Sequence, residues 1–200
     1  MNKTKLAVIY YSAYGTNLQL AKWAKEAAEK EGAEVRLLQV QELAPQKVID
    51  GQPAWKATME ASKDIPVATS ADLQWADAIL FSMPSRFGNM PSQMKQFLDI
   101  QGGLWANGEL VNKFVSAMSS AQNPNGGQEA TILNFYTTMY HWGAIVVTPG
   151  YTDPVYFTSG GNPYGVSVSV DQQGNMLSDV SASVAAQTKR LLDVTTTFKN

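Results

Sequence analysis

The chain has 200 residues, with 15 basic and 17 acidic side chains, no cysteine and a single histidine. This length is sufficient for one domain that buries a hydrophobic core without disulfides or a structural metal. The lack of cysteine excludes disulfides, thiolate zinc sites, cysteine-ligated iron–sulfur clusters and a cysteine nucleophile, and one histidine excludes paired-histidine zinc sites. Any redox chemistry therefore needs a bound organic cofactor, and we predict no metal site.

Charge and hydropathy limit the partners of the chain. A net charge of −2 argues against electrostatic binding of nucleic acid. Charged residues make up 16% of the chain, below the roughly 25% of an average domain, which favours a surface partly covered by other subunits. The apolar run that starts at Leu6 breaks at Ser12 without a cleavage site, and no later segment is long enough to span a membrane. We expect a cytoplasmic protein with no membrane insertion.

Strand-like and helix-like segments alternate along the chain. The first apolar run predicts a buried strand over 5–11, and the helical stripe that follows predicts a helix over 17–31. Further strands are expected over 34–40, 78–83, 113–119 and 144–148. Further helices are expected over 69–76, 92–99, 128–141 and 179–198. Residues 41–68 are expected to be irregular with a short helix near 55–62, and 150–175 to form a Gly/Pro-rich loop.

This alternation predicts an α/β fold. A parallel sheet with helices on both faces and right-handed crossovers is expected, with either the flavodoxin-like strand order 2-1-3-4-5 or a small Rossmann sheet. Residues 1–200 should form a single domain. In such sheets, ligands bind at the carboxyl ends of the strands, so the loops after the first, third and fourth strands are the candidate site.

The loop after the first strand has the composition of a phosphate site. It combines hydroxyl and amide groups with the free N–H groups of a helix start: Ser12, Ala13, Tyr14, Gly15, Thr16 and Asn17. It contains no Lys or Arg, and the glycine patterns of dinucleotide and triphosphate sites are missing. We therefore predict a monophosphate held by neutral donors, with an ordinary capped turn as the alternative.

The other two loops suit the edges of a planar ring. The second loop offers an Arg with fixed donors, an aromatic stacking face and a glycine: Pro84, Ser85, Arg86, Phe87, Gly88 and Asn89. The third offers small and amide groups: Ser120, Ala121, Gln122, Asn123, Gly126 and Gly127. Alone, these loops could be a surface turn and a flexible connection. Together with the phosphate loop they predict a mononucleotide, and FMN is the one that carries redox chemistry.

Two other classes with similar sheets are disfavoured. A response-regulator receiver needs acidic residues after the first strand and an Asp after the third, where this chain has Tyr10-Tyr11-Ser12 and Met83-Pro84. An α/β-hydrolase needs a Gly-x-Ser-x-Gly elbow, which the chain lacks.

Five motifs occur in order along the chain: Ser-x-Tyr-Gly after the first strand, Pro-Ser-Arg-Phe-Gly-Asn at 84–89, Gly-Gly-Leu-Trp at 102–105, Gly-Gly-Gln-Glu at 126–129 and Gly-Gly-Asn-Pro-Tyr-Gly at 160–165. Together they resemble the WrbA family of flavodoxin-like, FMN-dependent NAD(P)H:quinone oxidoreductases. The resemblance implies two-electron reduction of quinones by NAD(P)H through ping-pong hydride transfer. It also implies homotetramers whose FMN sites lie at subunit junctions.

The resemblance assigns roles to residues outside the three loops. Tyr14 matches the position that contacts NAD(P)H, and Trp105 matches an aromatic wall of the quinone pocket. His141 or Trp142 matches the family histidine that meets the flavin, with a structural helix-end role as the alternative for His141. The rival function is a non-enzymatic flavodoxin-type electron carrier or an FMN-binding regulatory protein. Carrier flavodoxins are usually shorter and strongly acidic, which this chain is not.

Overall fold

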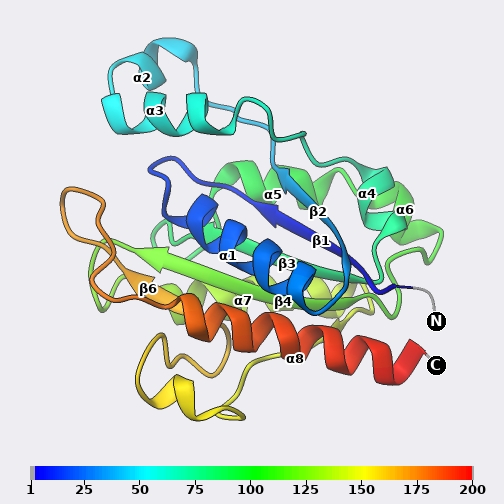
Figure 1. The fold of residues 1–200 in the computed structure, drawn as a ribbon. Coiled ribbons are helices and arrows are strands. Elements are labelled where there is room, and N and C mark those ends of the chain that lie inside the picture. The colour runs from blue at the N-terminus through cyan, green and yellow to red at the C-terminus, as the bar shows by residue number, and fades with distance from the viewer. Residues whose placement is uncertain (1–2, 200) are drawn as a thin grey trace.

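The computed structural model describes residues 3–199, so that residues 1, 2 and 200 of the predicted domain lie outside the described residues. A parallel sheet with the strand order β2-β1-β3-β4-β5 forms the centre, and β6 pairs with β4 (Figure 1). The strands are β1 (Lys5–Tyr10), β2 (Glu34–Gln39), β3 (Ala78–Pro84), β4 (Phe114–Ala121), β5 (Ile145–Val146) and β6 (Ser167–Ser169). The predicted flavodoxin-like order is confirmed, and the third and fourth strands coincide closely with their predicted ranges.

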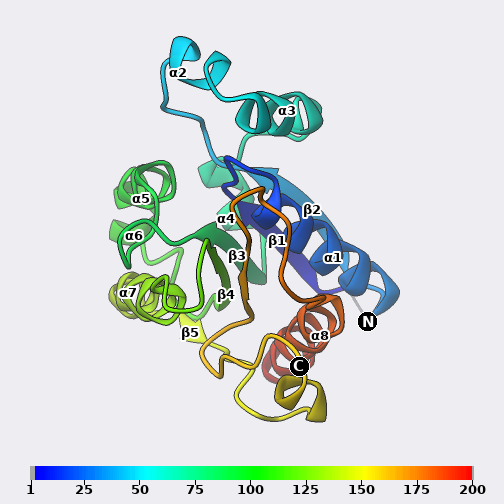
Figure 2. The same cartoon turned by 90° about the vertical axis from the view of Figure 1, so that its left-hand side faces the viewer.

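Helices cover both faces of this sheet (Figure 2). On one face lie α1 (Thr16–Lys30) and α8 (Ser181–Lys199). On the other lie α4 (Ser70–Trp75), α5 (Ser92–Asp99), α6 (Gly102–Ala106) and α7 (Gln128–His141). Helix α6 was not predicted, because Gly102 and Gly103 give no helical signal.

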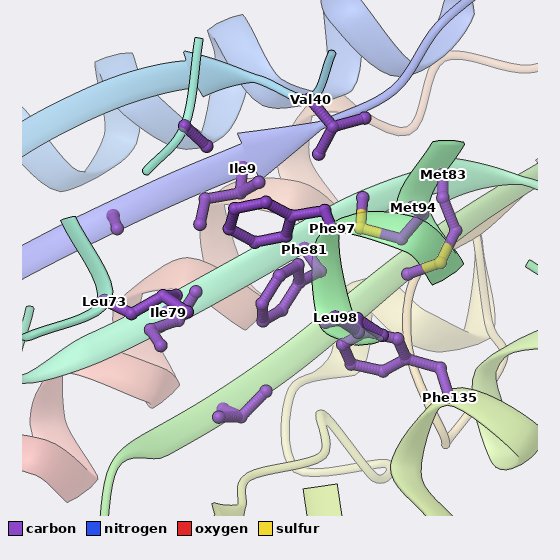
Figure 3. Close-up of a cluster of buried hydrophobic side chains, with 14 of the residues drawn as sticks. Ile9, Val40, Leu73, Ile79, Phe81, Met83, Met94, Phe97, Leu98 and Phe135 are labelled. Atoms are coloured by element: carbon purple, nitrogen blue, oxygen red, sulfur yellow. The ribbon is translucent and has the colours of Figure 1, made fainter. Parts of the chain in front are cut away.

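The core consists of two clusters, one on each face of the sheet. All residues of β3 and β4 are buried, as expected for central strands covered on both sides. Alternate side chains point to opposite faces, so Phe81 packs with Phe135 of α7 while Leu80 faces α1 and α8. Figure 3 shows the first cluster, in which side chains of α5 close over the strands. This packing fixes the strand ends, from which the candidate loops emerge.

Two segments leave the sheet at its opposite edges. The first, which we call the arm, comprises residues 41–68 and carries α2 (Gln46–Asp50) and α3 (Pro53–Ser62). The expected short helix is present but begins at Pro53, because proline suits the first turn of a helix. The expectation that the rest of residues 41–68 is irregular is wrong, since a second helix, α2, precedes α3. The arm stands away from the body of the molecule above the β1–α1 loop (Figure 1).

The second segment, which we call the outer loop, comprises residues 147–166 and contains a short 3₁₀ helix over Pro154–Phe157. The outer loop separates two short strands that together take the place of the expected fifth strand. Strand β5 pairs with the start of β4, and β6 pairs with its end. The predicted strand over 144–148 is therefore too long, and β6 was not predicted because its Ser-Val-Ser sequence lies within a glycine-rich region.

Side chains fill the gap that the outer loop leaves beside β4. The Gln187 amide donates to the Ala117 carbonyl (2.9 Å) and accepts from the Val166 N–H (2.7 Å). The Tyr136 hydroxyl accepts from the Ala117 N–H (3.1 Å) and donates to the Tyr164 carbonyl (2.7 Å). Both side chains are buried, so backbone groups that would otherwise lack partners are satisfied.

No helix within residues 3–199 is long and apolar enough to cross a membrane.

Candidate functional site

The three predicted loops meet at the carboxyl ends of adjacent strands. Strand β1 pairs with β3, and β3 with β4, in registers that bring Tyr10 beside Ser82 and Pro84 beside Ser120. The pairing of β3 and β4 continues into the loops, where the Ser85 N–H donates to the Ser120 carbonyl at 2.7 Å. The prediction that residues 12–17, 84–89 and 120–127 lie close together therefore matches the geometry.

Helix α1 begins inside the first loop, at Thr16, with Gly15 as its N-cap residue. Gly15 has a φ of +89°, which glycine adopts without strain. Within the described residues, no side chain caps the helix and its first turn holds no acidic residue. Its first N–H groups and the positive end of the helix dipole are thus available to an anion.

A buried polar network joins this helix start to the ends of β3 and β4. The Asn17 amide donates to the Ser120 hydroxyl at 2.8 Å, and the Ser82 hydroxyl donates to the Asn17 side-chain oxygen at 3.1 Å. Asn17 and Ser82 are almost completely buried, and Ser120 nearly so. Because each polar group has a partner, the network holds the first and third loops at a fixed separation.

The second loop is a tight turn that projects an aromatic ring. Arg86 and Asn89 exchange backbone hydrogen bonds of 2.8 and 3.0 Å, while Phe87 and Gly88 between them have φ values of +54° and +77°. A positive φ is a costly conformation for an aromatic residue. The Phe87 side chain is fully exposed at the tip of the turn. The backbone here is strained in order to present Phe87 rather than to bury it.

The second and third loops are locked against each other. The Ser85 hydroxyl donates to the Gly126 carbonyl at 2.8 Å and accepts from the Gly88 N–H at 3.3 Å. A Cβ atom on Gly127 would lie 2.8 Å from the Gly88 Cα atom, so only glycine permits this approach. Gln122 and Asn123 lie exposed at the tip of the third loop. The two ring-edge loops therefore form one rigid unit.

Trp105, His141 and Trp142 lie elsewhere, at the end of the sheet where the parallel strands begin, which we call the amino edge. Helix α7 starts beside the third loop and runs back for 14 residues, or about 20 Å, before it reaches His141. There the Trp105 Nε1–H donates to the His141 carbonyl at 2.9 Å, and the Asn112 N–H donates to the Gly143 carbonyl at 2.9 Å. In Figure 1, α6 and the β1–α1 loop lie at opposite ends of the sheet. Within one chain, these three residues therefore lie far from the three loops.

Sequence reasoning missed Glu42, a carboxylate close to the first loop. Its Oε2 accepts from the Tyr11 hydroxyl at 3.1 Å and from the Trp55 Nε1–H at 3.2 Å. Its Oε1 accepts from the Gln93 amide at 2.7 Å and from two backbone N–H groups. Burial and the neighbouring Glu42 raise the pKa of the Tyr11 phenol well above its usual value, so this phenol stays a hydrogen-bond donor. A lone Glu in a loop carries no signal in the sequence.

Comparison with known proteins places the chain in a family. Residues 4–153 match the model of the NADPH-dependent FMN reductases. The chain is 56% identical over 191 residues to the NAD(P)H dehydrogenase (quinone) of Deinococcus radiodurans, covering 96% of this chain and 95% of that relative. It is 42% identical to the protein of the same name from Geotalea uraniireducens, covering 85% and 86%.

The chain belongs to the NADPH-dependent FMN reductase family.

Solved structures agree on the fold of this family member. A WrbA-like flavodoxin from Agrobacterium tumefaciens superposes with a TM-score of 0.65 at 19% identity, covering 98% of this chain and 99% of that one. Flavodoxin 2 from Bacillus cereus gives a TM-score of 0.62 at 13% identity, with coverages of 96% and 99%. The resemblance to WrbA-type, flavodoxin-like oxidoreductases predicted from the motifs is confirmed.

The residues of the loops fit FMN, the cofactor that the family match indicates. The uncapped start of α1 suits a single phosphate, which needs fewer charges than a triphosphate. The second and third loops pack closely against each other, because Gly127 has no Cβ atom to meet Gly88. The groups that these loops bring to the strand ends are mostly neutral, as predicted for a monophosphate and a planar ring.

Proposed function

We propose that the protein catalyses the two-electron reduction of quinones by NAD(P)H, with FMN bound at the three loops and a ping-pong order of substrates. The observation that carries the proposal is 56% identity, over almost the whole chain, to a protein named NAD(P)H dehydrogenase (quinone). The neutral cradle at the strand ends supports it from the structure. We place the enzyme in the cytoplasm, where NAD(P)H is available.

In this mechanism the chain binds and orients. The backbone of residues 12–17 would hold the FMN phosphate, and the loops at 84–89 and 120–127 would border the ring. Bound FMN supplies the hydride acceptor and donor. With FMN bound, donors of the third loop would stabilise negative charge on the ring. Tyr14, which is 45% exposed, is available to NAD(P)H at the mouth of the site.

We further propose that the enzyme is a homotetramer whose FMN sites are completed by neighbouring subunits. Trp105 and His141 are exposed at the amino edge, too far from the loops of their own chain to act there. They can act only in the site of another copy, with Trp105 as a wall of the quinone pocket. Trp142 is buried in the core, which favours His141 as the residue that meets the ring. Exposed Ile100, Val111 and Tyr140 lie on the same helices or their connections and support contact between copies.

Rapid mixing tests the reaction. The FMN-loaded protein is mixed with NADH or NADPH without oxygen, and then with benzoquinone, while flavin absorbance is followed. We expect bleaching in the first step, recovery in the second, and parallel double-reciprocal plots in steady state. Flavin binding without NAD(P)H-dependent bleaching would instead indicate the electron carrier or a regulatory protein.

Mixed oligomers test the shared site. Gly127→Ala introduces the Cβ atom that conflicts with Gly88 and should impair the loops, whereas Trp105→Ala removes the distant wall. Each variant alone should have low quinone reductase activity. Co-refolded mixtures should regain part of it, because some sites combine intact loops with an intact Trp105. Activity no higher than the mean of the two variants, in mixtures shown by mass to contain both, would contradict a shared site.

A further inference from the structure

We propose that the arm binds the adenosine half of NAD(P)H, with Tyr14 and Trp55 as the stacking face and Glu42 as the residue that positions Trp55. This inference rests on the proposed function, since it takes NAD(P)H as the reductant. It assigns a substrate-binding role to Trp55, to which the sequence patterns gave no definite place.

The arm lies directly over the first loop. The Tyr14 hydroxyl donates to the Gln52 side-chain oxygen at 2.5 Å, which connects the loop to the start of α3. The Tyr14 and Trp55 rings meet edge to face, with their centroids 6.1 Å apart and an interplanar angle of 62°. Tyr14 is 45% exposed and Trp55 is partly exposed, so the pair leaves aromatic surface open at the mouth of the site. Purine bases stack on such surfaces in a way that tolerates different bases.

The order of strands assigns the adenosine half, rather than the nicotinamide, to this face. The nicotinamide must meet the flavin ring, and the ring loops follow β3 and β4. Trp55 approaches from the side of β1 and β2, on the other side of the phosphate loop, and neighbouring strands are about 4.8 Å apart. A dinucleotide that places its nicotinamide at the ring can extend its other half over the first loop, and the arm then lies within its reach.

Glu42 fixes the indole that forms this face. It accepts from the Trp55 Nε1–H, from Tyr11 just after β1 and from Gln93 of α5, so one carboxylate joins the arm to two parts of the body. The other end of the arm is held by the Tyr10 hydroxyl on Ser62 at 3.1 Å and by the Gln39 amide on the Ser62 and Ile65 carbonyls. With both ends anchored, the Trp55 ring is ordered before the substrate arrives, which lowers the entropic cost of binding.

Titration calorimetry with ADP-ribose tests the inference on the FMN-loaded protein. ADP-ribose contains the adenosine half but has no nicotinamide, so it binds without reducing the flavin. We expect Trp55→Ala to weaken binding roughly tenfold, which corresponds to a stacking contribution of about 1.4 kcal/mol. Trp55→Phe retains a ring but loses the bond to Glu42, and should fall between Trp55→Ala and the wild type. Glu42→Gln should weaken ADP-ribose binding about threefold while leaving FMN affinity unchanged.

Steady-state kinetics provides a second readout. Trp55→Ala should raise KM for NADH and leave kcat unchanged. KM for benzoquinone and KM for reduced nicotinamide mononucleotide should also stay unchanged, since neither compound contains adenosine. Phe157→Ala is the matched control, because Phe157 is half of an exposed aromatic pair with Tyr151, 5.2 Å apart, in the outer loop. It should bind ADP-ribose as the wild type does.

Unchanged ADP-ribose binding in Trp55→Ala, or no binding by the wild type, would overturn the inference. A protein that binds ADP-ribose through Trp55 but does not pass electrons to quinones would overturn only the proposed function. Equal increases of KM for NADH and for reduced nicotinamide mononucleotide would place Trp55 at the nicotinamide and would also overturn the inference.

Discussion

The arm and the outer loop leave opposite edges of the same sheet, but they are attached by different physical means. Polar side chains attach the arm, with Glu42 as the common acceptor, and several of these side chains are only partly buried. Close backbone packing, together with hydrogen bonds from fully buried side chains, attaches the outer loop. A Cβ atom on Gly165 would lie 2.0 Å from the Ala117 carbonyl oxygen of β4. Within the loop, one on Gly161 would lie 2.1 Å from the Tyr156 carbonyl oxygen.

This difference suggests a division of roles. Hydrogen bonds near solvent open at a modest cost, so the arm can open without unfolding the sheet, while its anchors hold Trp55 in place in the closed state. Backbone packed to van der Waals contact cannot shift without disturbing the sheet beneath it. The arm is thus suited to substrate binding, and the outer loop to completing the core. Substitutions in the two segments should therefore differ in the size and the reach of their effects.

The largest effect should come from Gly165→Ala. The new Cβ atom conflicts with main-chain atoms of β4, which cannot move as a side chain would. We expect a loss of about 3–5 kcal/mol in the free energy of unfolding, comparable with severe core overpacking. Denaturant titration measures it. Gly103→Ala, in α6 with nothing within 4 Å of the added atom, should be neutral or slightly stabilising.

The second prediction concerns Gln187, whose side chain fills the gap beside β4. Gln187→Leu leaves the Val166 N–H and the Ala117 carbonyl buried without their partner. Each such group costs roughly 1–3 kcal/mol, so a total loss of about 2–4 kcal/mol is expected. A Gln187→Leu protein as stable as the wild type in denaturant titration would show that this gap does not depend on the amide.

The arm should respond locally rather than globally. Glu42→Ala leaves the Trp55 indole, the Tyr11 phenol and the Gln93 amide without their common acceptor, and we expect the arm to become easier to open by about 1–3 kcal/mol. Hydrogen exchange measures this directly, with faster exchange in α3 and little change in β3 and β4. Faster exchange throughout the sheet would mean that the arm and the body unfold together.

The smallest effect is expected for Tyr156→Phe, in the outer loop. The Tyr156 hydroxyl is buried and has no hydrogen-bond partner among residues 3–199, so its removal should change stability at pH 7 by less than about 0.5 kcal/mol. Burial raises the pKa of this phenol from 10 to about 12.

The folded state therefore holds this proton more tightly than the unfolded state, and the stability that depends on it is complete below pH 10 and lost as the pH rises toward 12. Denaturant titrations at pH 7 and pH 11.5 should show a smaller alkaline loss in Tyr156→Phe. An equal loss in both proteins would contradict the assignment to this phenol.

The sequence predicted those elements whose local pattern alone decides their structure. Continuous apolar runs predicted β1, β3 and β4, and the three loops at their ends followed from the order of strands. Shorter elements were not predictable, because β6 and α6 depend on tertiary contacts and glycine gives no local signal. The Glu42 network was also hidden, since its members are 31 to 51 positions from Glu42 or lie in the arm. The distance of His141 from the loops became evident only once α7 was placed along the sheet.

The division of the fifth strand also affects how copies of the chain can associate. An uninterrupted edge strand presents a row of backbone groups on which another sheet can extend. Here that edge consists of two residues in β5, three in β6 and, between them, groups already bonded to side chains. No continuous template remains for a strand from a second molecule on this side. On this side, contact between copies would therefore involve helices and loops, and an open-ended β-stacked polymer is disfavoured.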